Sequence, residues 1–232
     1  HLFHLGTETT IGNAATQDPM FIRFSDQEST SVYQPTAINT AGTFQLDKGN
    51  KIVAAVQGKD YILILTDQAA YVAQFVGPPF TFSIRQVGTN CGCLGQHAVA
   101  FAQGAVFWMG TSGGFFQFDG TVKQLPCLVE DFVFTTGDGN LGLNFNASEI
   151  VYAGHNSLYT EVNWFYPKSG SNQIDRIVTY NYGEASWYTG SLDRTTYQDA
   201  DLFTAPYATD YIPKDQSGTN DPSDTPLFPI SG

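Results

Sequence analysis

AVFWMGTSGGFFQFDG, residues Ala105 to Gly120, is the stretch that decides the fold class. One apolar run leads into a short polar turn around Gly113-Gly114 and then into a second apolar run that ends in Asp119-Gly120. Two such runs joined by a glycine turn are typical of a β-hairpin. The earlier segment ILILTDQAAYVAQF, Ile62 to Phe75, aligns with it without a gap, so the hairpin predicts a repeat.

The repeat has the spacing of a propeller blade. Phe75 corresponds to Phe118, an offset of 43 residues, and a four-stranded blade spans roughly 40–45 residues. A third, less regular unit is set by EIVYAGHNSLYTEVNWFYP and RIVTYNYGEASWYTG, where a turn at Gly183-Glu184 precedes Trp187. We therefore predict an all-β fold in which residues 1–190 form β-propeller blades of antiparallel meanders with inserted loops.

The composition favours many short strands joined by turns. Aromatic residues make up 14% of the chain, with 23 Gly and 11 Pro, and no apolar window fits a helix of three turns. Gly77-Pro78-Pro79 is expected to stop the first meander, because proline donates no ladder hydrogen bond, and FTFSIRQVG, residues 80–88, is expected to follow as an outer strand or a connection. Residues 128–134 fit either a strand or a short helix. In residues 191–232, Asp and Pro recur and the apolar pattern fades, which predicts an extended acidic connection or arm.

The charge excludes wholesale wrapping of nucleic acid. The net charge is −12 with only 10 Lys and Arg, and phosphate binding needs clustered basic residues. No run approaches the roughly 18 apolar residues of a membrane span, and no signal-peptide pattern is present, so we expect no membrane partner. The chain begins at His1, inside an expected strand, which suggests a piece of a longer protein.

The residues that most often carry chemistry do not form a recognisable pattern. Cys91, Cys93 and Cys127 lack zinc-ligand spacing and are expected to be free, mostly buried thiols, so we predict no metal. His97 and His155 lie near no nucleophile motif and are expected to be structural.

Two further patterns favour structural interpretations over catalytic ones. GDGNLG, residues 137–142, satisfies G-x-G-x-x-G, but no convincing helix start follows it, so neither a nucleotide site nor any other cofactor is expected. The carboxylate pairs Glu130 and Asp131, or Asp26 and Glu28, would have to lie about 5 or 6.5–9.5 Å apart across a sugar ring to act as a glycosidase. Close neighbours of this kind are more simply solvated or capping groups, so we predict that the chain is not an enzyme.

Aromatic residues are concentrated in the repeats, around Trp108, Phe115, Trp164 and Trp187. Alternation along strands predicts that about half of them face the neighbouring blade as packing. A sugar-stacking platform is the other interpretation, and it stays open at this point.

Several segments resemble a known family of virion proteins. IRFSDQESTSVYQPTAINTAGTFQLDKGNKIVA, LTDQAAYVAQFVGPPFTF and VAFAQGAVFWMGTSGGFFQFDGTVKQLPC, with the later VNWFYP and RIVTYNYGEASWYTG, are similar to tail nozzle proteins of short-tailed bacteriophages (podoviruses), the tail tubular protein B and packaged-DNA stabilisation type. The resemblance runs from about residue 21 to 197. Its distinctive residues are Ser25, Asp26, Gln27, Glu28, Gly77, Pro78, Pro79, Phe80, Trp108, Met109, Gly110, Asp119, Gly120 and Trp187.

The resemblance implies a structural protein of the virion, located in the phage tail. Such a protein is expected to form a homo-oligomeric ring, a homo-hexamer, below the tail adaptor protein. The ring prolongs the channel for DNA ejection, helps retain packaged DNA and anchors tail fibre or spike proteins. Double-stranded DNA passes through without specific binding.

Two other classes of function remain open at this stage. One is a tail-associated propeller that binds or cleaves host-surface glycans, and the other is a cellular propeller scaffold, which the phage-like motifs disfavour. The family often has Trp where this chain has Phe24 and Tyr33, which keeps an aromatic side chain for packing. An acidic channel wall repels DNA, and we expect carboxylates of the longer loops to face the lumen.

Overall fold

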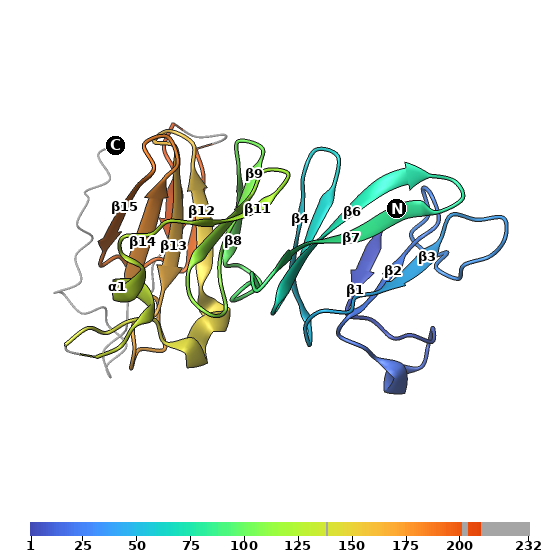
Figure 1. Ribbon diagram of the computed structural model, residues 1–232, viewed down its shortest axis with the longest axis horizontal. Coiled ribbons are helices and arrows are strands. Elements are labelled where there is room, and N and C mark those ends of the chain that lie inside the picture. The colour runs from blue at the N-terminus through green and yellow to red at the C-terminus, as the bar shows by residue number, and fades with distance from the viewer. Residues whose placement is uncertain (138, 201–203, 210–232) are drawn as a thin grey trace, which may run out of the picture.

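The computed structural model describes residues 1–137, 139–200 and 204–209, and they form an all-β fold (Figure 1). The strands make five antiparallel sheets. The N-terminal sheet has the order β1-β2-β3 and contains β1 (Phe3–Leu5), β2 (Phe21–Phe24) and β3 (Gly42–Gln45). The predicted all-β class is confirmed, and closure of the sheets into a propeller ring stays a prediction.

Three four-stranded meanders follow, each with its strands in chain order. The first meander consists of β4 (Ile52–Gln57), β5 (Ile62–Thr66), β6 (Ala69–Gly77) and β7 (Thr81–Thr89). The second meander consists of β8 (Val99–Ala102), β9 (Ala105–Met109), β10 (Phe115–Phe118) and β11 (Val122–Leu125). The third meander consists of β12 (Tyr152–Asn156), β13 (Glu161–Tyr166), β14 (Arg176–Asn181) and β15 (Ser186–Gly190).

The 43-residue offset is present in the first two meanders. Strands β5 and β9 begin and end at equivalent positions, and the corresponding side chains of Leu65 and Trp108 are both fully buried. The quoted hairpin pairs Met109 with Phe115 and Val106 with Phe118 across the glycine turn. The repeat in the sequence therefore reports a repeated strand-turn-strand unit.

Two local expectations are decided by the structure. Gly77-Pro78-Pro79 does not stop the first meander: it leads into the turn of the β6–β7 hairpin, where the prolines need no ladder hydrogen bond. Of the two expectations for the segment after it, the outer strand is confirmed, because β7 is the edge strand of this sheet. Residues 130–134 form the short helix α1 (Glu130–Phe134). Two 3-10 helices, Ala14–Thr16 and Phe145–Ile150, complete the described helices, and none of the three is long and apolar enough to cross a membrane.

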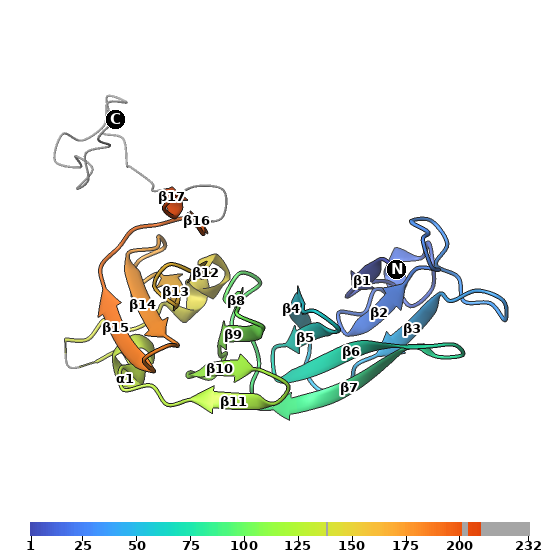
Figure 2. The same cartoon turned by 90° about the horizontal axis from the view of Figure 1, so that it is seen from above.

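The first meander is buried on both faces because its side chains alternate between two cores. Leu63 and Leu65 of β5 join the large core shared with the second and third meanders, whereas Ile64 joins a smaller core. Ile22 and Leu46 of the N-terminal segment contribute to that smaller core. Figure 2 shows the resulting arrangement, with the sheets following one another along an arc.

Each of the three tryptophans connects its strand to a backbone segment outside its own sheet. Trp108 Nε1 donates to the carbonyl of Cys91 at 2.8 Å, and Trp164 Nε1 donates to that of Ala98 at 3.1 Å. Trp187 Nε1 donates to the carbonyl of Pro126 at 2.8 Å. Because an indole N–H needs a partner when buried, these bonds fix how successive meanders pack together.

Part of the predicted arm packs on the third meander. Strands β16 (Thr196–Gln198) and β17 (Tyr207–Thr209) pair with each other, and β16 lies beside β12. The ring of Tyr197 occupies space left by Gly154, where an added Cβ would lie 2.5 Å from that ring. The remainder of the predicted arm, residues 201–203 and 210–232, lies outside the described residues.

Candidate functional site

The Ser25-Asp26-Gln27-Glu28 loop follows β2 and is held by hydrogen bonds to Leu2 and Thr40. Ser25 is fully buried and exchanges hydrogen bonds with Leu2 at 2.9 and 2.8 Å. The Asp26 carboxylate accepts hydrogen bonds from both the backbone and the hydroxyl of Thr40, which lower the pKa of Asp26. The carboxylate of Asp26 therefore binds Thr40, at the far end of the loop, and so stabilises the loop conformation, which is a structural role.

The Gly77-Pro78-Pro79-Phe80 turn lies at the same end of the molecule as this loop. Phe24, directly before Ser25, contacts Phe82 of β7 with ring centroids 5.0 Å apart, and Phe75 contacts the same ring at 5.6 Å. Phe80 is 76% exposed at the tip of the hairpin. The structure thus brings together two of the sequence motifs that are about 50 residues apart.

The other motif residues lie in or against the second meander, away from that end. Trp108 and Met109 are fully buried in β9. At Gly110, an added Cβ would lie 2.8 Å from the Gly113 carbonyl oxygen, so glycine permits the tight β9–β10 turn.

The remaining motif residues lie in a turn between two strands and at a contact between two sheets. Asp119 accepts a hydrogen bond from Lys123 at 2.7 Å, and Gly120 has a φ of +116°, so both belong to the β10–β11 turn. Trp187 packs on Phe115 with ring centroids 4.6 Å apart.

The Cys-Gly-Cys run is the joint between the first and second meanders. Cys91 and Cys93 donate backbone hydrogen bonds to the carbonyls of Gln68 and Thr66. All three cysteines are free, as predicted, and burial raises the pKa of the Cys91 and Cys127 thiols to about 11. Their placement and protonation fit packing and give no reactive thiolate.

His155 takes part in a hydrogen-bonded chain that ties residue 199 to the third meander. Its Nε2 lies 2.9 Å from the hydroxyl of Tyr182, and its Nδ1 lies 3.3 Å from Asp199. Asp199 also accepts from the backbone N–H groups of Ser157 and Ala200. Burial lowers the pKa of His155, and the charge of Asp199 opposes that shift. Both ring nitrogens have partners, as expected for a structural histidine.

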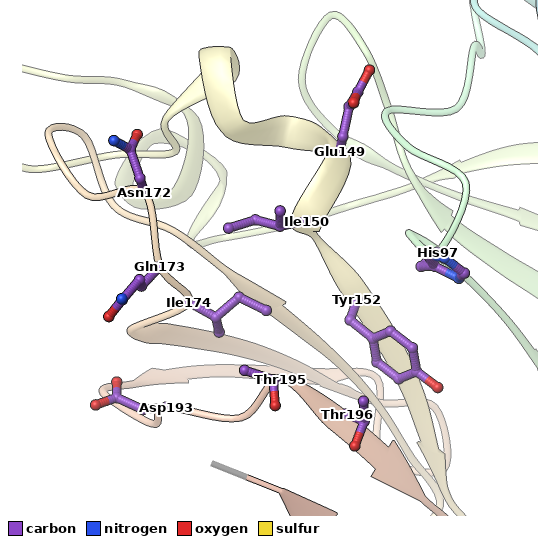
Figure 3. A pocket seen from close by; sticks show the side chains of 10 residues that line it. All are labelled: His97, Glu149, Ile150, Tyr152, Asn172, Gln173, Ile174, Asp193, Thr195 and Thr196. Atoms are coloured by element: carbon purple, nitrogen blue, oxygen red, sulfur yellow. The ribbon is translucent and has the colours of Figure 1, made fainter. Parts of the chain in front are cut away.

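An open cavity of about 640 Å³ lies along the edge of the third meander, and we call it the edge cavity. Figure 3 shows His97 and Tyr152 on one side and Ile150 and Ile174 in the middle. The rings of His97 and Tyr152 are stacked, with their centroids 5.8 Å apart. The polar residues that line it are Glu149, Asn172, Gln173, Asp193, Thr195 and Thr196.

The edge cavity has the apolar floor and polar rim that are typical of small-molecule sites. His97 was the only one of its residues that sequence reasoning singled out. The others come from three segments, residues 149–152, 172–174 and 193–196, and no local pattern marks them.

No constellation for catalysis is visible in the described part of the chain. Neither carboxylate pair lines the edge cavity, and Asp26 is engaged by Thr40. The G-x-G-x-x-G stretch follows α1 rather than a strand and includes residue 138, which lies outside the described residues. Within the described residues no group of three His, Cys, Asp or Glu side chains is placed to hold a metal ion.

The aromatic residues of the meanders serve mostly as packing. Rings on β9, β10 and β13 are buried, and Phe115, Trp164 and Trp187 form one contact network. Tyr188, which follows Trp187 in β15, is exposed.

Comparisons with known proteins place the chain in no family. No family model matches it, and no curated protein matches it. Among solved structures, a mutant of the Synechocystis apocarotenoid oxygenase has a TM-score of 0.36 and 12% sequence identity. The match covers 75% of this chain and 43% of that chain, so this chain spans less than half of that structure's length. A similarity this weak carries no argument about function.

Proposed function

We propose that this chain is part of a tail nozzle protein of a short-tailed bacteriophage, a structural virion protein whose ring prolongs the DNA channel. The observation that carries the proposal is the position of the motif residues. Those around Ser25, Gly77, Trp108, Asp119 and Trp187 build loops, turns and contacts between successive sheets, rather than the lining of a cavity. A structural protein, which maintains a shape rather than binding a small ligand, is expected to have its distinctive residues in such turns and contacts between sheets.

The charge supports the same proposal. With a net charge of −12, the chain has little capacity to bind phosphates through counterion release, so passing DNA would not be held. The carboxylate of Glu28, in the long loop between β2 and β3, is exposed. The expectation that loop carboxylates line the lumen is part of this proposal, together with the tail adaptor, fibre and spike partners.

Electron microscopy of the full-length protein, alone and in its particle, tests the proposal. Closed rings of six subunits on the tail axis are the expected result. Monomers, or trimers at the tip of a fibre, would contradict it. A map with the long loops on the outer surface of the ring would refute the lumen assignment while leaving the ring itself intact.

A tail-associated protein that binds or cleaves host-surface glycans is the second candidate. Burial of most aromatic rings removes much of the stacking platform that favoured it. The edge cavity, with its stacked His97–Tyr152 pair, is the specific observation that keeps it open. A panel of host-surface polysaccharides, tested for binding and for release of reducing ends, separates this candidate from a purely structural role.

A further inference from the structure

The β6–β7 hairpin projects beyond the rest of its sheet. Strands β6 and β7 have nine residues each, whereas β5 has five. Strand β5 pairs with residues 70–73 of β6, and residues 74–77 continue past the end of β5 with β7 as their pairing partner. We call residues 74–83 the hairpin tip, and Figure 1 shows it at the end of the molecule that carries the N-terminal sheet.

The hairpin tip exposes large apolar side chains. Phe80 is 76% exposed, and Phe75 and Val76 are 59% and 52% exposed. The loop between β2 and β3 lies at the same end of the molecule in both Figure 1 and Figure 2, and it carries Val32 and Ile38, which are also exposed. Single exposed apolar residues are ordinary, but a group of them on two neighbouring loops indicates a contact surface.

The hairpin tip is held in shape by packing at its base. Phe75 and Phe82 pair across the hairpin, with ring centroids 5.6 Å apart. The ring of Phe82 also contacts Phe3 at 4.8 Å and Phe24 at 5.0 Å. The exposed side chain of Phe80 is therefore presented by an ordered hairpin and does not belong to a frayed strand end.

The backbone of the hairpin tip is suited to a medium without water. Pro78 and Pro79 have no N–H group, so neither residue leaves an unpaired donor when water is removed, which would otherwise cost free energy. The N–H of Phe82 donates to the carbonyl of Phe80 at 2.6 Å within the turn. Removal of water from this turn therefore costs less than it would for most loops.

The charge of this end of the molecule is close to neutral. The chain has 22 acidic residues, yet residues 68–118 include no Asp or Glu, and Arg85 is their only Lys or Arg. In the neighbouring loop Asp26 is bonded to Thr40, and Glu28 is exposed. An apolar tip with so little charge fits a neutral partner rather than a polyanion or a polycation.

The exposed area distinguishes a lipid surface from a second protein. A fully buried aromatic residue contributes about 150–250 Å², and a stable protein interface needs about 800 Å² from each partner. The partly exposed rings of Phe75 and Phe80 supply less than half of that area. A bilayer has no such requirement, because protruding apolar groups enter the boundary between headgroups and acyl chains about 5–10 Å deep.

We propose that the hairpin tip inserts into the interfacial region of a zwitterionic lipid bilayer. The expectation of no membrane partner rests on the lack of a spanning segment in the sequence, and an interfacial contact requires none. This inference goes beyond the nozzle function and does not depend on ring formation.

Sedimentation of the intact chain with phosphatidylcholine vesicles tests the proposal. The wild type is expected to bind, and Phe80→Ser is expected to weaken binding about tenfold because it removes the most exposed ring of the hairpin tip. Leu128→Ser is the matched control: Leu128 is 97% exposed but lies just before α1, at the far end of the molecule, so binding should not change. Vesicles that also contain phosphatidylglycerol should bind more weakly, because the net charge of −12 is repelled by an anionic surface.

Phe80→Trp gives an independent measure of insertion. The native tryptophans lie in the second and third meanders, outside the hairpin tip. Brominated phosphatidylcholine is therefore expected to quench the added indole fluorescence of Phe80→Trp and to leave the fluorescence of the wild type unchanged.

Four results would overturn the proposal. The first is no binding to phosphatidylcholine vesicles, and the second is binding that Phe80→Ser and Leu128→Ser change equally. The third is an absence of quenching in Phe80→Trp. The fourth is self-association without lipid that Phe80→Ser abolishes, which would make a second copy of the chain the occupant. Thermal unfolding shows whether each variant retains the fold. Electron microscopy of the ring is a separate readout, so failure of the nozzle proposal would not resemble failure of this one.

Discussion

Replacing Gly92 by alanine is expected to break the joint between the first and second meanders. An added Cβ would lie 2.0 Å from the carbonyl oxygen of Asp67 and 2.2 Å from its carbonyl carbon. Both are backbone atoms that no change of rotamer relieves, and overpacking of this kind costs about 1–3 kcal/mol. The backbone hydrogen bonds of Cys91 and Cys93 flank the clash, and losing both adds about 2 kcal/mol. The expected loss in the free energy of unfolding is therefore about 3–5 kcal/mol.

Urea unfolding followed by circular dichroism measures this loss, and Gly104→Ala is the control. Gly104 has a φ of +83° but nothing within 4 Å of an added Cβ, so its substitution is expected to cost only the roughly 1–2 kcal/mol of left-handed backbone. The melting temperature should follow, by about 2–4 °C per kcal/mol for a chain of this size. If Gly92→Ala loses no more stability than Gly104→Ala, the close approach at the joint does not stabilise the fold as argued here.

Three further predictions concern protonation and reactivity. Thr40→Val removes a hydrogen bond that lowers the pKa of Asp26, so an NMR titration should show that pKa rising toward 3.8. The ionised Asp26 carboxylate stabilises the fold above its ordinary pKa, and as the pH falls the variant should lose this stability at a higher pH than the wild type does. Burial holds the pKa of His155 below 6.5, so protonation of this imidazole destabilises the fold as the pH falls through that range. Asp199→Asn removes the negative charge that raises the pKa of His155, so the pKa should fall further, and an unchanged imidazole titration would contradict this. Burial raises the pKa of Cys93 to about 12, so this thiol should resist alkylation at neutral pH until denaturant is added, as peptide mapping by mass spectrometry would show.

The sequence predicts the parts of this fold that depend on local pattern. The alignment of Phe75 with Phe118 locates two meanders, because repeated alternation and glycine turns act over a few residues. The same reasoning left residues 80–88 open between an outer strand and a connection, since proline ends a strand equally well at a hairpin turn and at the end of a sheet. The contact between Phe24 and Phe82 has no local signal, because only the folded chain brings those two segments together.

The candidate sites show where pattern reasoning fails, and why. In β13, the alternation of Glu161 and Asn163 with Val162 and Trp164 predicts an ordinary strand with one solvated face. What changes the outcome is Tyr197, more than 30 residues later, which covers that face because Gly154 leaves room for its ring. Neither residue is unusual by itself. Burial of Asn163 and Thr179 on that face follows from a contact across the third meander rather than from any single strand, which is why a strand that resembles a surface strand can be covered on both faces.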